Sequence, residues 1–258
     1  EAALREDPRV SGWADLRYFA EVGSTNDIAL QLAAAGAREG TAVLAEVQRS
    51  GRGRRGHVWH SPPGTGVYLS AIVRPHSSAL QLVTLAAGVA AARAIAALTA
   101  LPIELKWPND VVIGRPWRKV GGVLCEATGS AGRIDAVVIG IGLNVGEEAY
   151  PPELAGRATS LESELGREVD RDRVVVELLA QLREIAGRLG DADASWVPEA
   201  WRTFGRAGLG GAPVRWREAE VERRGLARDL DADGALVVDA NGVRTRVIAG
   251  EVTWERMS

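Results

Sequence analysis

The sequence predicts an α+β protein with two parts: a mixed β-sheet with helices over residues 1–206 and a small β-barrel over residues 207–258. Consecutive strand-like runs without intervening helices exclude a regularly doubly wound fold in the first part. Near residues 204–211 the pattern changes to short β-rich runs. The turns Asp231–Gly234 and Asn241–Gly242 between those runs are strong hairpin signals.

Each element follows from its local pattern. Ser24, Thr25 or Asn26 can cap a helix over roughly residues 27–35. Pro108 interrupts the apolar run over residues 103–113, because proline cannot donate to a strand ladder. Further helices are predicted over 79–100, 171–189 and 195–204, and strands over 41–47, 67–73, 103–113, 119–127 and 134–145. The barrel strands are predicted over 214–218, 220–230, 235–239, 243–249 and 251–255.

Composition narrows the functional classes. Across 258 residues, 46% are hydrophobic, 25% are charged and the net charge is −3, which is ordinary for a globular protein and unlike a nucleic-acid-binding surface. Cys125 is the only cysteine, so no internal disulfide forms, and this fits a reducing cytoplasm. The apolar run Leu82–Leu98 contains Arg93 and small alanines, which favours a buried helix over a membrane span.

Lysine is scarce and clustered. Among 31 basic side chains only Lys106 and Lys119 are lysines, within the phrases KWPND and KVGG. A lysine ammonium is a compact point charge, whereas arginine presents a flat fork, so the two do not replace each other at a site that places one charge on one oxygen. The two lysines are therefore candidates for binding an anion.

The segment Gly51–Gly56 reads GRGRRG and matches a dinucleotide-binding fingerprint only formally. The residues that follow, HVWHSPPGTG, cannot begin the helix that such a motif requires. Three arginines within four positions repel one another, so we expect a loop that is mobile when empty and orders around phosphate, with Trp59 available to stack on a flat ring. A solvated basic loop or a nucleic-acid contact are the alternatives.

The phrase KWPND places a cation, an amide and a carboxylate close together. On an extended strand, Lys106, Pro108 and Asp110 would share one face, unless the proline introduces a bulge. Such a set suits a nucleoside triphosphate with Mg²⁺, and a plain Pro-Asn-Asp turn is the alternative. Three of the four asparagines of the chain, Asn26, Asn109 and Asn144, lie in such motifs.

The segments STN, Gln48 followed by SGRGRRGxxW, KWPND, KVGG and GIGLN together resemble the signature of biotin protein ligases, over about residues 14–204. The resemblance implies a biotin- and ATP-binding catalytic domain over residues 1–206 and a Src-homology-3-like barrel over residues 207–258. It also implies that biotin and MgATP form biotinyl-5′-adenylate, and that the biotinyl group passes to a lysine of the carrier domain of a biotin-dependent carboxylase. The family uses no tightly bound prosthetic group.

The resemblance also assigns roles to residues. Lys119 would hold the biotin carboxylate beside the α-phosphate, Lys106 would stabilise charge on that phosphate, and Asp110 would orient or deprotonate the incoming lysine. Catalytic roles are implied for Lys119, Lys106, Arg54 and Asp110. Biotin contacts are implied for Ser24, Thr25, Asn26, Gln48, Gly51, Arg52, Gly53, Arg54, Lys119, Gly121 and Gly122. Contacts with ATP or the adenylate are implied for Arg52, Arg54, Trp59, Lys106, Asn109, Lys119 and Asn144, and Mg²⁺ would be held through phosphates, with Asn109 or Asp110 as candidate ligands.

Two features depart from the resemblance or qualify it. His57 stands where the family commonly has arginine, and too few residues precede Trp13 for a winged helix-turn-helix, so a catalysis-only form is expected. The alternatives are a lipoate or octanoate ligase or transferase of the same fold and a nucleic-acid-binding regulator. We expect a cytoplasmic monomer or weak homodimer without membrane or nucleic-acid partners.

Overall fold

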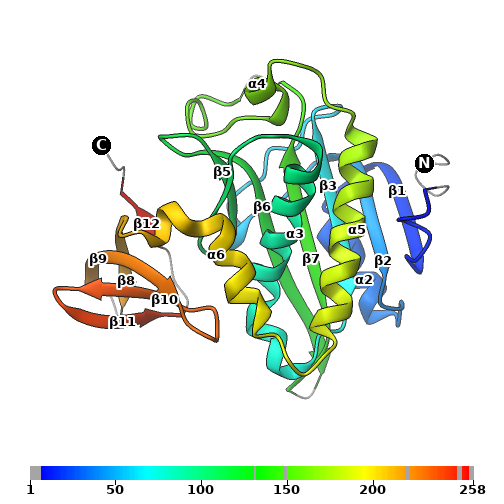
Figure 1. Ribbon diagram of the computed structural model, residues 1–258. Coiled ribbons are helices and arrows are strands. Elements are labelled where there is room, and N and C mark those ends of the chain that lie inside the picture. Colours follow the sequence, from blue (N-terminus) through cyan, green and yellow to red (C-terminus); the bar gives the residue numbers. More distant parts are fainter. Residues whose placement is uncertain (1–6, 131, 148–149, 219–220, 249–251, 256–258) are drawn as a thin grey trace.

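A seven-stranded mixed sheet organises the larger part of the chain in this computed structural model, which describes residues 7–130, 132–147, 150–218, 221–248 and 252–255 (Figure 1). The strand order is β1-β2-β3-β7-β6-β5-β4. Strand β1 runs parallel to β2, and the other neighbouring pairs are antiparallel. The strands are β1 (Asp15–Val22), β2 (Thr41–Gln48), β3 (Gly66–Val73), β4 (Ile103–Lys106), β5 (Asp110–Ile113), β6 (Arg118–Ser130) and β7 (Arg133–Asn144).

Helices cover both faces of this sheet. Helix α2 packs against β2, β3, β6 and β7, around a small apolar cluster that includes Ala29, Val43 and Ile72. Helices α3 and α5 pack on the opposite face over the main core, and α6 lies beside α3 and β4 (Figure 1). The helices are α2 (Thr25–Ala34), α3 (Val83–Leu98), α4 (Leu161–Leu165), α5 (Arg171–Leu189) and α6 (Trp196–Leu209), with 3-10 turns η1 (Arg54–Gly56) and η2 (Ser77–Leu82).

The apolar helix predicted over residues 79–100 is a core helix. Among the described residues, the segment Ser77–Leu98 is long and apolar enough to cross a membrane, and 72% of its 18-residue window is buried inside the protein. Its small residues are buried against the sheet, and a Cβ at Gly88 would be in ordinary contact with Leu105 of β4. Packing against the sheet therefore accounts for the apolar composition of this helix.

A separate antiparallel sheet with the order β11-β10-β9-β8-β12 follows. Its strands are β8 (Pro213–Glu218), β9 (Val221–Leu230), β10 (Leu236–Ala240), β11 (Val243–Val247) and β12 (Thr253–Trp254). No ladder joins the outer strands β11 and β12 among the described residues, so the second sheet is confirmed but a closed barrel is not. The predicted strand positions Glu220, Ala249 and Glu251 lie outside the described residues. Helix α6 extends to Leu209, and a division at residue 206 stays a prediction.

One expectation was wrong, and one strand was missed. Residues 103–113 form two strands joined by a tight turn at 107–109, with Lys106 opposite Asp110, and not one interrupted strand. The hairpin brings these two residues together across the ladder, so the alternation expected for an extended strand does not apply. Strand β1 was missed because its sequence, DLRYFAEV, is rich in charge and only two of its eight residues are buried.

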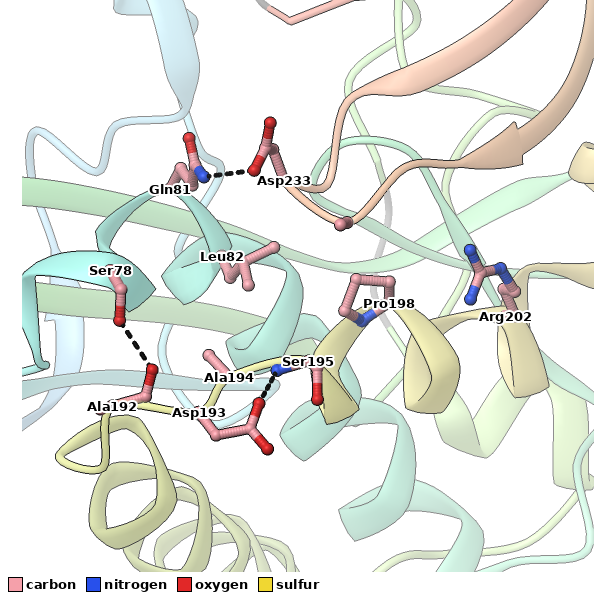
Figure 2. A pocket seen from close by; sticks show the side chains of 11 residues that line it. Ser78, Gln81, Leu82, Ala192, Asp193, Ala194, Ser195, Pro198, Arg202 and Asp233 are labelled. Atoms are coloured by element: carbon pink, nitrogen blue, oxygen red, sulfur yellow. Dashed lines mark hydrogen bonds between the residues drawn. The ribbon is translucent and has the colours of Figure 1, made fainter.

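The second sheet docks on the first part through polar contacts as well as apolar ones. Gln81 Nε2 of η2 donates to Asp233 Oδ1 in the turn after β9 over 3.0 Å, and Figure 2 shows this bond beside a cavity of about 410 Å³. Arg202 of α6 donates to Asp229 Oδ1 and to the carbonyl of Leu230, over 2.6 and 2.5 Å. These bonds fix the turn over residues 231–234 against the helical layer.

An ion pair joins β2 to α5 near the start of β3. Arg171 donates to both carboxylate oxygens of Glu46, over 2.8 and 2.7 Å, and the amide of Gly64 donates to the same carboxylate over 2.8 Å. The Arg171 hydrogen bonds hold the pKa of Glu46 at about 2, well below its ordinary value. This pair therefore anchors the segment that leads into β3.

Replacing Arg171 with methionine should reduce the free energy of unfolding by about 1–2 kcal/mol at neutral pH, allowing for partial exposure of the pair. Because the folded-state pKa of Glu46 is depressed, this contribution is complete above about pH 4.5 and is lost as the pH falls toward 2. Urea unfolding between pH 7 and 2.5 measures it. Arg133→Met, which breaks the exposed pair with Asp135, is the matched control and should change stability little. A pH-independent difference between Arg171→Met and the unaltered protein would contradict the prediction.

Candidate active site

A cavity of about 940 Å³ lies over one face of the large sheet and reaches the second sheet at β12. It brings together all but two of the predicted site residues: Ser24, Thr25, Asn26, Gln48, Arg52, Gly53, Arg54, Trp59, Lys106, Asn109, Asp110, Lys119, Gly122 and Asn144. The two others, Gly51 and Gly121, do not line it. A Cβ at Gly51 would lie 2.7 Å from Ser61 Oγ, and one at Gly121 would lie 2.5 Å from Leu143 Cδ2, so both permit close packing beneath the site.

Glycines on β6 and β7 form the floor of the cavity. A Cβ at Gly140 would overlap Asn26 Oδ1, and one at Gly142 would lie 2.5 Å from the indole of Trp59. Gly122 pairs with Gly142 across the ladder, and a Cβ there would lie 3.2 Å from Lys119 Nζ. The missing side chains leave room for functional groups directly on the sheet.

At one end of the cavity the polar groups are uncharged, and they come from α2, β2 and β3. The backbone N–H and hydroxyl of Thr25 donate to Gln48 Oε1 over 2.9 and 3.1 Å. The Ser70 hydroxyl lies 2.7 Å from Thr25 Oγ1 and 2.6 Å from Asn26 Oδ1. Ser24, Thr25, Asn26 and Ser70 are all buried. Such a fixed set of short donors and acceptors suits a small polar ring with apolar edges.

Carboxylates connect this end to the arginine-glycine loop. Asn26 Nδ2 donates to Glu126 Oε2 over 2.7 Å, and the same oxygen lies 3.7 Å from Arg52 Nη2. Arg52 also forms a two-pronged pair with Asp27 of α2, over 2.8 and 2.5 Å, and these hydrogen bonds raise its pKa. Arg52 is thus neutralised by its neighbours in this conformation.

The loop itself is a small hairpin. The amide of Gly53 donates to the His57 carbonyl over 2.7 Å, and the amide of Trp59 donates to the Gly51 carbonyl over 2.8 Å. Arg55, with φ of 56°, and Gly56, with φ of 75°, make the tip. His57 is exposed and shapes the hairpin through its backbone.

The charged end is organised by one carboxylate. Lys119 Nζ lies 2.5 Å from Asp110 Oδ1, and Lys106 Nζ lies 3.8 Å from Asp110 Oδ2. The β4–β5 hairpin places Lys106 opposite Asp110, and β6 brings Lys119 alongside. Lys119 Nζ also lies 5.3 Å from the centre of the Trp59 ring, on the ring face.

Cations outnumber carboxylates at this end. Arg54 and Arg157 also line the cavity, and neither forms an ion pair with a carboxylate among the residues that the structure describes. Burial lowers the pKa of Lys106, and the charges of Lys119 and Arg157 add to this effect against the opposing charge of Asp110. Burial also lowers the pKa of Arg54. An anion with several oxygens would relieve this repulsion.

The two remaining asparagines stabilise the backbone around the charged end. Asn109 Nδ2 donates to the Val123 carbonyl over 2.9 Å, while the Val123 amide donates to the Asn109 carbonyl over 2.9 Å. Asn144 Nδ2 donates to the Thr159 carbonyl over 3.0 Å. No group of three metal-binding side chains occurs among the described residues. One carboxylate and one amide fit a magnesium ion held mainly by a ligand's phosphates.

Sequence reasoning missed several residues that line the cavity or bond to its lining. Ser70 and Glu126 lie within ordinary strand patterns and hydrogen-bond to Thr25 and Asn26 from outside the lining. Arg157 lines the cavity from a loop without a motif. Trp254 lies near the C-terminal end, yet it lines the same cavity. Cys125, by contrast, is not a reactive group, since burial raises the pKa of its thiol to about 12.

Substituting Gly142 with alanine should displace the Trp59 ring, because the new Cβ would overlap the indole. We expect a change in near-ultraviolet circular dichroism and a loss of about 1–3 kcal/mol of stability. Gly187→Ala in α5 is the matched control, since the space within 4 Å of its new methyl group is open, and it should be neutral or slightly stabilising. Identical spectra and unfolding curves for Gly142→Ala and the unaltered protein would contradict the account of the floor.

Comparison with known proteins agrees with this geometry. Residues 18–144 match the model of the biotin/lipoate A/B protein ligase family. The chain is 35% identical over 255 residues to the biotin–[acetyl-CoA-carboxylase] ligase of Mycobacterium tuberculosis, covering 95% of this chain and 91% of that protein. It is 32% identical over 242 residues to the bifunctional ligase/repressor BirA of Bacillus subtilis, covering 92% of this chain and 73% of that protein.

Solved structures agree as well. The biotin protein ligase from Aquifex aeolicus in complex with biotin and ATP superposes with a TM-score of 0.80 and 29% identity, over 95% of this chain and 100% of that chain. The match includes the second sheet, since so little of either chain is left out. By the extent and identity of these matches, the chain belongs to the biotin/lipoate A/B protein ligase family, among its biotin protein ligases.

Proposed function

We propose that this protein condenses biotin with ATP to biotinyl-5′-adenylate and transfers the biotinyl group to one lysine of a biotin carboxyl carrier domain. One observation carries the proposal: an uncharged, hydrogen-bonding slot and a cluster of excess cations share one cavity. The uncharged ring of biotin suits the slot, and its carboxylate suits the cations. The names of the relatives support the same reaction, as does the solved relative that holds biotin and ATP.

The first step needs two anions to meet. The biotin ring binds at Ser24, Thr25, Asn26 and Gln48, and its carboxylate extends over the glycine floor to Lys119. A carboxylate oxygen attacks the α-phosphorus of ATP, forming the acyl–phosphate bond while the bond to pyrophosphate breaks. Lys106 and Arg54 offset the charge that develops on the phosphate oxygens, which is an electrostatic contribution of roughly 3–4 kcal/mol for a well-placed group.

The second step uses the same charged end. The uncharged amine of the carrier lysine attacks the acyl carbon, and AMP leaves with the electron pair of the broken bond. Ligand oxygens take the place of the Asp110 carboxylate beside the two lysines. The Asp110 carboxylate is then free to orient or deprotonate the incoming amine. The loop over residues 51–59 covers the mixed anhydride and limits its hydrolysis.

Mg²⁺ would be held by the phosphates with Asn109 or Asp110, and it would supply charge neutralisation on the triphosphate. The chain supplies the remaining cations, Lys106, Lys119 and Arg54, and no tightly bound prosthetic group is required. We retain as proposals a Src-homology-3-like barrel for the C-terminal sheet, a division at residue 206, a cytoplasmic setting and a monomer or weak homodimer.

Incubation with biotin, MgATP and a purified carrier domain should add one biotinyl group to one lysine, measured by mass spectrometry of the carrier. Substituting that lysine with arginine provides the control. A reaction that proceeds with lipoate and not with biotin would overturn the proposal, and so would a carrier mass that never changes.

Lys119→Arg should slow pyrophosphate release with biotin and MgATP by about 100-fold while leaving the unfolding transition unchanged, because a planar fork cannot place a single charge between two anions. Arg118→Lys, at the adjacent position, changes a side chain paired with Glu164 and is the matched control. Near-normal pyrophosphate release by Lys119→Arg would show that the ammonium is not required.

A further inference from the structure

The β4–β5 hairpin, which carries Lys106, Asn109 and Asp110, is hydrogen-bonded on two sides. On the side of the large sheet, Asn109 exchanges two hydrogen bonds with Val123 of β6, each over 2.9 Å. On the other side, Trp107 reaches into the junction with the second sheet. The residue is only 4% exposed and belongs to the buried core.

Trp107 makes two hydrogen bonds to the second sheet. Its Nε1 donates to the Gly234 carbonyl over 3.0 Å, and its own carbonyl accepts from Nε1 of Trp254 on β12 over 3.1 Å. The partners, in the turn between β9 and β10 and on β12, lie 127 and 147 residues further along the chain. The backbone and the side chain of one turn residue are therefore both tied to a different sheet.

Both partners are themselves fixed. Gly234 adopts φ of 80° in a turn whose Asp233 and Ala235 amides donate to Asp231 Oδ1, each over 2.9 Å. A Cβ at Gly234 would lie 2.7 Å from Leu85 Cδ1, so the turn is in close contact with α3. Figure 2 shows the same turn from the side of the neighbouring cavity, with Gln81 bonded to Asp233.

Trp254 is held by an aromatic neighbour. Its ring meets the edge of Trp117, with centroids 5.5 Å apart and an interplanar angle of 73°, and Arg115 lies over the Trp117 ring at 4.8 Å. Trp117 belongs to the connection between β5 and β6, the strands that begin with Asp110 and carry Lys119. Through Trp254, the second sheet thus contacts Trp107 and Trp117, which adjoin the strands of the charged end.

We propose that Trp254 and the Gly234 turn are positioning groups that hold Lys106 and Asp110 in the geometry that binds the nucleotide phosphates. This inference rests on the proposed function. Neither group needs to touch the reacting atoms, since both act through Trp107. Loss of either hydrogen bond lets the hairpin turn shift relative to β6, which weakens the phosphate end of the cavity and leaves the biotin slot, on α2, β2 and β3, unchanged.

Trp254→Phe tests the inference, because it keeps an aromatic ring and removes the N–H that donates to the Trp107 carbonyl. We expect the KM for MgATP in pyrophosphate release to rise about five- to tenfold, and the KM for biotin to stay within about twofold. Trp13→Phe is the matched control: it removes an indole N–H that donates to the Leu179 carbonyl over 3.2 Å, on β1's side of the molecule. That control should leave both KM values unchanged.

Two further variants keep the test decisive. Trp107→Phe removes the bond to Gly234 and should reproduce the selective effect on ATP if Trp254→Phe does not fold. In the Lys106→Met background, Trp254→Phe should raise the KM for MgATP by less than about twofold further, because the group through which Trp254 acts is already gone. The inference is overturned if Trp254→Phe raises the KM values for MgATP and for biotin equally. It is also overturned if Trp254→Phe raises the KM for MgATP no more than Trp13→Phe does. An inactive unaltered protein would instead refute the proposed function.

Discussion

The arrangement of the cavity depends on one shared carboxylate. Asp110 lies between the two lysines of the chain, at 2.5 Å from Lys119 and 3.8 Å from Lys106, while Arg54 lines the same space without a carboxylate partner in the described part of the chain. A single carboxylate cannot balance these charges, and partial burial makes the imbalance costly. Under the proposed function, Asp110 acts as a substitute anion that ligand oxygens replace.

The uncharged end of the cavity is linked to this charge balance through a hydrogen-bonded chain. Asn26 contacts Glu126, Glu126 faces Arg52, and Arg52 pairs with Asp27. Because every member has a partner, a change at Asn26 reaches Arg52 of the arginine-glycine loop through Glu126. The uncharged end of the cavity and this loop thus belong to one network of contacts.

Much of this could be predicted from local sequence signals. Helix α5 begins and ends at the predicted residues, with Asp170 capping its first amides, and the glycine-containing turns of the second sheet were evident from their residues. The motif residues cluster in one cavity because most lie near the end of a strand, in an adjoining loop or in the first turn of α2. The hairpin at residues 103–113 was not predictable in this way, since the pairing of Lys106 with Asp110 is visible only once the ladder exists.

The misses share a physical reason. Ser70, Glu126 and Trp254 belong to ordinary β patterns, and what makes them part of the site is the neighbour that the tertiary structure supplies. For Ser70 that neighbour is α2, and for Trp254 it is a carbonyl 147 residues earlier in the chain. Local propensity carries no information about such contacts. Strand β1 was missed for a related reason, because a charged edge strand has too little burial to show a pattern.

A crystal structure with biotin and a non-hydrolysable ATP analogue would show whether the two lysines neutralise the reacting anions. If they do, Lys119 Nζ leaves Asp110 and lies within hydrogen-bonding distance of both the biotin carboxylate and an α-phosphate oxygen, with Lys106 on the phosphates. If both ligands bind while Lys119 stays paired with Asp110 and neither ammonium meets a ligand oxygen, charge neutralisation by these lysines is not what brings the reactants together.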